Sequence, residues 1–157
     1  MRIGVISDTH GSVYAVESVL KAAGTVDAWI HLGDHYSDAN LLRHTGAQVY
    51  AVKGNCDLMQ GAPAEAVIEL GEIRIFIAHG HTYQVKNTLS RLAYRAEELY
   101  CRAALYGHTH CPAYEMLGSL ALLNPGSPSQ PRGGGIRGTF AVLTIDKGLI
   151  TGEILTL

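Results

Sequence analysis

The sequence has no surplus of charge of either sign, no long apolar run and no pattern of paired cysteines. Its 12 Lys and Arg against 14 Asp and Glu give a formal net charge of −2, so we expect no basic surface that grips nucleic acid or an anionic bilayer. The apolar runs fall far below the ~20 residues that span a membrane, and the run after Arg2 is too short for a signal peptide. Cys56, Cys101 and Cys111 are odd in number and lack CxxC spacing, which favours a reducing cytoplasm over a disulfide framework.

The composition is that of a folded domain. Hydrophobic residues make up 47% of the chain and charged residues 17%, which excludes a disordered or fibrous protein. A length of 157 residues predicts a single domain, 1–157, with a substantial core. Eight histidines stand out in this composition, and their positions indicate what the chain does.

Apolar runs alternate with turn signals along the chain. In the first half, strands at 2–7, 28–32 and 48–53 alternate with a helix between Ser12 and Gly24 and another at 39–44. This β-α-β-α-β order predicts an α/β fold that begins with a parallel sheet. The second half predicts a hairpin of 67–70 and 73–77, a helix over 88–102, strands at 104–106, 116–123 and 140–145, and a last hairpin that turns at 146–148.

Five polar clusters each follow a predicted strand. They are Asp8-Thr9-His10, Gly33-Asp34, Gly54-Asn55-Cys56-Asp57, His79-Gly80-His81 and Gly107-His108-Thr109-His110. Ligands of open α/β sheets bind outside the carboxyl ends of the strands, so we expect these clusters to meet in one crevice.

The converging side chains form a set of metal donors. They are carboxylates, imidazoles and one carboxamide: Asp8, His10, Asp34, Asn55, His79, His108 and His110. Such mixed nitrogen and oxygen donors suit Mn, Fe, Zn, Co or Ni rather than a structural cysteine site. Seven donors are too many for one tetrahedral ion but fit two ions, which at a spacing of roughly 3.5–4 Å can hold the attacking and leaving oxygens of a displacement at phosphorus.

The ordered set of motifs resembles the calcineurin-like metallophosphoesterase superfamily. Within it, Gly54-Asn55-Cys56-Asp57 and Asn124-Pro125-Gly126-Ser127 are similar to the small bacterial and archaeal phosphodiesterases of the YfcE type. The resemblance implies a four-layer αββα sandwich of two mixed β-sheets flanked by helices. It also implies the ligand sets: Asp8, His10 and His110 for one ion, Asn55, His79 and His108 for the other, and Asp34 as the bridge.

The candidate catalytic residues are Asn55, Cys56, Asp57 and His108. Many members of the superfamily have His where Cys56 stands, and that His is assigned to the leaving oxygen. Cys56 is then either a shorter, softer substitute or a small filler. Asp57 either orients a neighbouring side chain or caps the next segment.

Several other residues have a structural and a functional interpretation. His31, inside a strand, and His44, at a helix end, are predicted to be structural. His35 and His81 lie beside proposed ligands and are candidates for contact with substrate or ligands. Arg132 and Arg137, with Gly133-Gly134-Gly135, either cradle a phosphate or form a flexible loop.

We therefore expect a phosphodiesterase that depends on two divalent metal ions. Mn²⁺ is the preferred ion, and Ni²⁺, Fe²⁺, Co²⁺ and Zn²⁺ are the alternatives. A hydroxide bridging the ions would attack a small soluble phosphodiester. The protein could also form a homo-oligomer, which the sequence does not decide. Two divalent ions less Asp8, Asp34 and one hydroxide leave about one positive charge, which matches a monoanionic diester better than a monoester. The alternatives are a phosphomonoesterase on a nucleotide or phosphoprotein, and a Vps29-like non-catalytic protein-binding scaffold.

Overall fold

The first half of the chain builds most of one sheet. In the computed structural model, which describes residues 1–58 and 60–157, three strands run parallel: β1 (Arg2–Ile6), β2 (Ala28–His31) and β3 (Gln48–Ala51). They are connected through α1 (Val13–Ala23), the 3₁₀ turn η1 (Tyr36–Asp38) and α2 (Ala39–Arg43). The final hairpin, β9 (Thr139–Asp146) and β10 (Leu149–Thr156), adds antiparallel strands and gives the order β10-β9-β1-β2-β3.

The second half builds a second mixed sheet, of order β4-β5-β6-β8-β7. Its strands are β4 (Glu65–Leu70), β5 (Ile73–Ala78), β6 (Ala103–Leu105), β7 (Ala113–Leu117) and β8 (Leu120–Asn124), with α3 (Ser90–Glu98) between β5 and β6. The pairs β5–β6 and β6–β8 are parallel, and the outer pairs β4–β5 and β7–β8 are antiparallel.

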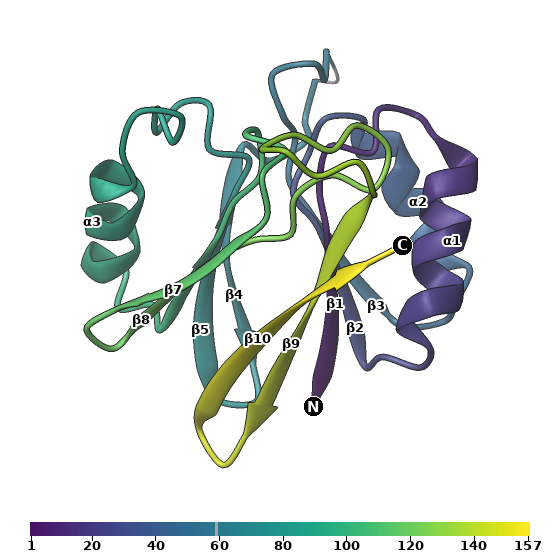
Figure 1. Cartoon of the computed structure of the whole chain (residues 1–157). Helices are drawn as coiled ribbons and strands as arrows, with labels where there is room; N and C mark the ends of the chain where they lie inside the picture. The colour runs from purple at the N-terminus through teal and green to yellow at the C-terminus, as the bar shows by residue number, and fades with distance from the viewer. Residues whose placement is uncertain (59) are drawn as a thin grey trace.

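The two sheets face each other and the helices lie outside them (Figure 1). Alternate residues of each strand point to opposite faces, so Ile3, Val5 and Ile30 enter the core between the sheets, whereas Ile6 and Trp29 pack under α1 and α2. A third cluster lies between α3 and the outer face of the second sheet. The four-layer αββα sandwich is therefore confirmed.

Two local predictions were wrong. The strand expected over 116–123 is a hairpin of β7 and β8, which turns at Gly118 in the left-handed conformation, φ +59°. The helix expected over 88–102 spans only Ser90–Glu98, because Tyr100 takes a left-handed φ of +55° that no α-helix continues through. No helix among the described residues is long and apolar enough to cross a membrane.

His31 is buried at the end of β2 and ties the strand end to its neighbours. Its Nδ1 accepts the Gly33 N–H at 3.2 Å, so its Nε2 carries the proton and donates to Thr9 Oγ1 at 3.0 Å. Burial lowers the pKa of His31 to about 4, which keeps the ring neutral. His44 lies at the C-terminal end of α2, so both histidines have the structural positions predicted for them.

The neutral His31 predicts a loss of stability in acid. Because the folded pKa of about 4 lies below the unfolded value, the stability that His31 gives is complete above pH ~6.5 and is lost as the pH falls from there towards 4. Between pH 7.5 and 5, the free energy of unfolding of the wild type should fall by about 2 kcal/mol more than that of His31→Gln, whose amide keeps a donor for Thr9. Urea unfolding of both proteins in chelator measures this difference, and equal losses would show that His31 does not titrate as described.

Candidate metal centre

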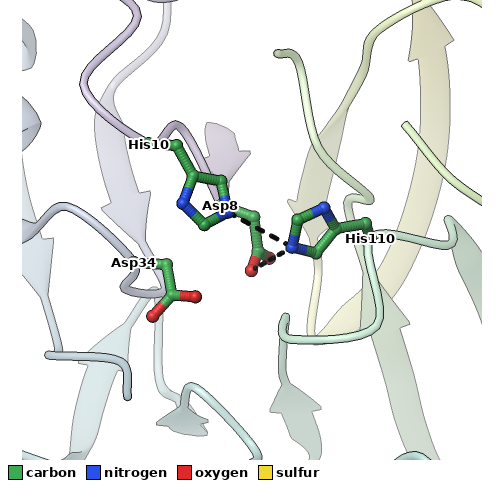
Figure 2. A group of neighbouring side chains, drawn as sticks. All are labelled: Asp8, His10, Asp34 and His110. Atoms are coloured by element: carbon green, nitrogen blue, oxygen red, sulfur yellow. Dashed lines mark hydrogen bonds and ion pairs between the residues drawn. The ribbon is translucent and has the colours of Figure 1, made fainter. Parts of the chain in front are cut away.

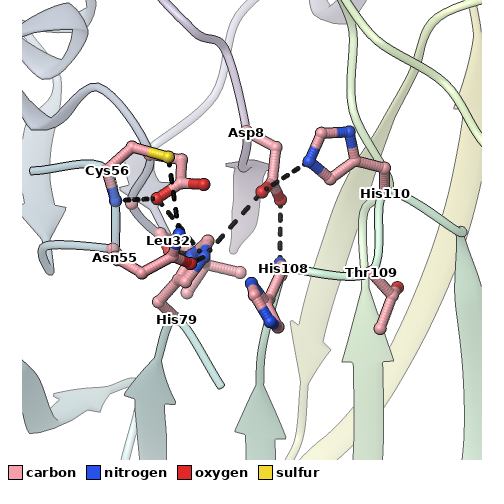
Figure 3. A network of polar contacts seen from close by, with 12 residues as sticks. Asp8, Leu32, Asn55, Cys56, His79, His108, Thr109 and His110 are labelled. Atoms are coloured by element: carbon pink, nitrogen blue, oxygen red, sulfur yellow. Dashed lines mark hydrogen bonds and ion pairs between the residues drawn. The ribbon is translucent and has the colours of Figure 1, made fainter. Parts of the chain in front are cut away.

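The five polar clusters meet at one edge of the sandwich. Each candidate side chain follows the carboxyl end of a strand of one sheet or the other: Asp8 after β1, Asp34 after β2, Asn55 after β3, His79 after β5, and His108 and His110 after β6. Figure 3 shows side chains from the two sheets pointing toward one another across this edge. The predicted convergence is therefore confirmed.

A first group of donors consists of Asp8, His10, Asp34 and His110. One ligand atom from each lies within 4.8 Å of the others, and the side chains come from both sheets (Figure 2). Asp8 is fully buried, and Asp34 and His110 are nearly so. Four donors from three separated parts of the chain thus face one small volume.

The ring of His110 is oriented by the segment after β8. Its Nδ1–H donates to the Gln130 carbonyl at 2.7 Å, which leaves Nε2 facing Asp8 Oδ1 at 3.2 Å and His10 Nε2 at 3.3 Å. The Asp8 carboxylate beside it raises the pKa of His110. Burial acts to raise the pKa of Asp8, but His110 and His79 beside it bring that pKa below its usual value. The group therefore favours a positive charge at its centre, whether from a proton or from a cation.

A second group lies on the other side of Asp34. The Nδ1–H of His79 donates to the Leu32 carbonyl at 2.8 Å, so its Nε2 faces Asp34 Oδ1 at 3.4 Å and Asn55 Oδ1 at 3.2 Å. The His108 ring lies 5.1 Å from the His79 ring, centroid to centroid. Burial and the neighbouring His79 lower the pKa of His108 to about 4, so its ring is neutral and can donate a lone pair.

The donors fit a divalent cation. Oδ1 of Asp8 is a buried carboxylate oxygen without a hydrogen-bond partner in the described part of the chain, an arrangement that costs free energy unless a positive charge compensates it. Carboxylate oxygens and imidazole nitrogens are the ligands that first-row divalent metals take. Backbone carbonyls hold the outer nitrogens of His79 and His110, as is usual for histidines that bind metals.

The backbone is strained where these side chains are presented. Left-handed φ values, which non-glycine residues rarely adopt, occur at five of them: Asp8 (+56°), His10 (+47°), Asp34 (+58°), His108 (+67°) and His110 (+61°). Two glycines permit the close approach of the loops. A Cβ on Gly54 would lie 2.1 Å from Asp34 Oδ1, and one on Gly107 would lie 1.9 Å from Ser7 Oγ. Strain of this kind persists only where the surroundings fix it, and it gathers at functional sites.

Asp57 fixes the loop after β3 against the loop after β2. Its carboxylate accepts four backbone N–H groups, from Gly54, Asp34, His35 and Tyr36, at 2.8–3.0 Å. Burial acts to raise the pKa of Asp57, but these four donors outweigh it and lower the pKa. Both oxygens are thus engaged with the backbone, which makes Asp57 a positioning residue; the catalytic role predicted for it stays a prediction.

Cys56 lies beside Asp34 and is exposed. Its backbone N–H donates to Asp34 Oδ1 at 2.9 Å, and its Sγ lies 3.4 Å from Asn55 Nδ2. Desolvation and the Asp34 carboxylate raise the pKa of the thiol, which stays protonated. The exposure does not fit a buried filler, one of the two interpretations that the sequence left open.

Hydrogen bonds from the segment around the end of β8 hold the backbone of the first group in place. The sequence did not predict this role. Ser127 Oγ and Ser129 Oγ donate to the Asp8 carbonyl at 2.7 and 3.1 Å. The side-chain amide of Asn124 donates to the Gly107 carbonyl and to Thr109 Oγ1, each at 3.0 Å. The sequence showed Asn124 and Ser127 only as part of a family motif, and a polar pair beside Pro and Gly after an apolar strand was the available signal.

The remaining candidates lie at the margins of the two groups. His35 is exposed, and its Nδ1 lies 2.8 Å from Asp38 Oδ1. The His81 ring lies 5.4 Å from that of His79 and 6.1 Å from that of His108, which places it beside the second group. Arg132 and Arg137 line a cavity that begins at the residue after His110.

Comparison with known proteins gives the same family as the motifs. Residues 1–148 match the model of the calcineurin-like phosphoesterase superfamily domain. YsnB of Bacillus subtilis, named a probable metallophosphoesterase, is 36% identical over 155 residues, which are 96% of this chain and 88% of YsnB. The phosphodiesterase YfcE of Escherichia coli is 32% identical over 160 residues, covering 85% of this chain and 83% of YfcE.

Solved structures agree with the fold. The crystal structure of a conserved uncharacterized protein and predicted phosphoesterase from Streptococcus pneumoniae has a TM-score of 0.86 and 37% identity, covering 99% of this chain and 88% of that one. Vps29 of Entamoeba histolytica, solved with Zn²⁺, has a TM-score of 0.75 and 24% identity over 99% of both chains, a likeness of fold alone. The family model covers nearly the whole chain and YsnB and YfcE each exceed 30% identity to it, so this protein belongs to the calcineurin-like phosphoesterase superfamily.

Proposed function

We propose that the protein is a phosphodiesterase that depends on two divalent metal ions, Mn²⁺ foremost, and hydrolyses a small phosphodiester in the cytoplasm. The observation that carries the proposal is the gathering of Asp8, Asp34 and three inward-facing imidazole nitrogens in one buried volume. The name of the relative YfcE, a phosphodiesterase at 32% identity, supports the reaction class.

Two ions are proposed because the donors form two groups that share Asp34. Asp8, His10 and His110 would hold one ion, and Asn55, His79 and His108 the other. Asp34 supports the bridging role because it belongs to the first group and its Oδ1 also lies 3.4 Å from His79 Nε2.

Bound divalent ions would supply Lewis acidity, which lowers the pKa of water towards neutrality and offsets charge on phosphate oxygens. The chain's own contribution is orientation. Backbone carbonyls fix the rings of His79 and His110, and the Cys56 N–H holds the Asp34 carboxylate. A site preorganised in this way does not rearrange when charge develops during the reaction.

The charge of the site favours a diester over a monoester. Asp8 and Asp34 are the two carboxylates of the proposed ligand set, and with one hydroxide they leave about one positive charge from two divalent ions. That charge matches one monoanionic diester. The phosphomonoesterase alternative predicts the reverse order of kcat/KM on matched mono- and diesters, and a Vps29-like scaffold predicts hydrolysis of neither. The complete donor set supports an enzyme over a scaffold.

Asp34→Asn tests the shared bridge. We expect the substitution to lower metal content at both groups and kcat/KM on bis(p-nitrophenyl) phosphate by more than about 100-fold, beyond the ~10–100-fold that loss of an outer partner costs. His110→Ala should chiefly empty one group and His79→Ala the other. Mass spectrometry of metal per chain after loading with Mn²⁺, with kinetics on the same samples, measures both quantities.

Asp146→Asn, at the exposed end of β9, is the matched control and should resemble the wild type. Wild-type metal content with retained turnover in Asp34→Asn would contradict the shared bridge. Full activity after verified removal of all metal would contradict metal catalysis altogether.

Cys56→His tests whether residue 56 serves the leaving group. An aryl oxide leaves without a proton, whereas a nucleoside alkoxide needs one, and general acid catalysis is typically worth 10²–10⁴-fold. The substitution adds an imidazole beside Asp34, so it should raise kcat/KM for alkyl or nucleoside diesters more than for aryl diesters. The measurement is the ratio of kcat/KM for nucleoside diesters to kcat/KM for aryl diesters, taken at equal metal content, with Cys56→Ser as the control. An unchanged ratio would assign leaving-group chemistry elsewhere.

A further inference from the structure

A cavity of about 500 Å³ lies on the flank of the metal centre. Cys111 and Pro112, which follow His110 directly, form part of its lining. The loop 131–137 forms most of the remainder, and Thr139 and Thr156 complete it. The cavity is thus built from the loop after β6 and from the loop between β8 and β9.

The loop that lines the cavity is attached to His110. The Gln130 carbonyl accepts the His110 Nδ1–H at 2.7 Å, and the Arg132 N–H donates to the His110 carbonyl at 3.1 Å. One hydrogen bond holds the imidazole and the other holds the backbone of the same residue. The cavity therefore adjoins the loop that holds His110 in place.

The lining of the cavity carries two positive charges. Arg132 and Arg137 line the cavity together, and no Asp or Glu is among the lining residues. In the described part of the chain, neither guanidinium forms an ion pair or a hydrogen bond, and both side chains are exposed. In a chain of net charge −2, two unpaired arginines in one hollow point to an anionic ligand.

The glycines between the two arginines leave the loop backbone open to such a ligand. Gly133 and Gly134 have φ values of +76° and +86°, and a Cβ on Gly134 would meet nothing within 4 Å. Consecutive backbone N–H groups in turns of this kind bind anions when no side chain covers them. The two arginines and these glycines thus line the same cavity.

We propose that this cavity binds a second phosphate group, carried on one ester arm of the diester substrate. The inference rests on the proposed function, because the charge count at the metal centre leaves about one positive charge, which the reacting diester uses up. A further phosphate must find its cations elsewhere, and Arg132 and Arg137 supply two. The preferred substrate class is therefore a phosphodiester of a phosphorylated alcohol, such as a nucleoside that bears another phosphate.

The test compares two aryl diesters that differ by one phosphate: the p-nitrophenyl ester of thymidine 5′-phosphate, with either a free 3′-hydroxyl or a 3′-phosphate. The leaving group is the same in both, so the chemistry at phosphorus is unchanged. For the Mn²⁺-loaded wild type, the 3′-phosphate should lower KM and raise kcat/KM about 10- to 100-fold, the effect of one or two charge-assisted contacts.

The double variant Arg132→Ala/Arg137→Ala should bring this ratio close to 1. Arg91→Ala/Arg102→Ala removes two exposed arginines away from the cavity and should keep the ratio. A ratio near 1 in the wild type, or a ratio that survives loss of Arg132 and Arg137, would overturn the proposal.

Calorimetric binding of thymidine 3′,5′-bisphosphate and of thymidine 5′-phosphate separates the cavity from the chemistry. If the bisphosphate binds more tightly and Arg132→Ala/Arg137→Ala loses this difference, the cavity proposal is supported even when neither ester is hydrolysed. The lack of hydrolysis would then contradict the proposed function but not the cavity proposal. Equal affinities for the two nucleotides would overturn the cavity proposal whether or not hydrolysis occurs.

Discussion

The structure depends on an electrostatic conflict at one edge of the sandwich. The carboxylates of Asp8 and Asp34 lie in a buried volume with the inward-facing nitrogens of His79 and His110, and one oxygen of Asp8 has no hydrogen-bond partner among the described residues. Lone pairs brought together in this way repel one another unless a positive charge lies between them. The divalent cations that we propose would resolve the conflict, and the two sheets hold the donors in place for them.

The cost of that arrangement is distributed over the loops. Five proposed ligands take left-handed φ values, and Gly54 and Gly107 leave room where a Cβ would collide. The compensation comes from hydrogen bonds behind the site: four to the Asp57 carboxylate, and two from Ser127 and Ser129 to the Asp8 carbonyl. The strained backbone at the ligands is therefore held in place by the hydrogen bonds behind the site.

The alternating strands and the converging clusters could be predicted because both follow from local rules, whereas the four layers were implied by the family resemblance. Strand periodicity separates Ile3 and Val5 from Ile6, and polar residues at strand ends meet wherever parallel strands share an edge. The sequence did not predict the β7–β8 hairpin, where Gly118 was the only turn signal, or the early end of α3 at Tyr100. It also did not predict the support by Ser127, since hydrogen bonds between residues 119 positions apart leave no periodic trace. Long-range polar contacts are set by the tertiary fold, and only the fold revealed them.

The central claim is that two ions share Asp34. Crystals of the Mn²⁺-loaded protein, measured at the manganese absorption edge, test it most directly. We expect two anomalous peaks, one on either side of the Asp34 carboxylate, with His10 and His110 in contact with one and Asn55, His79 and His108 in contact with the other. A single peak, or two peaks of which one lies away from Asp34, would contradict it.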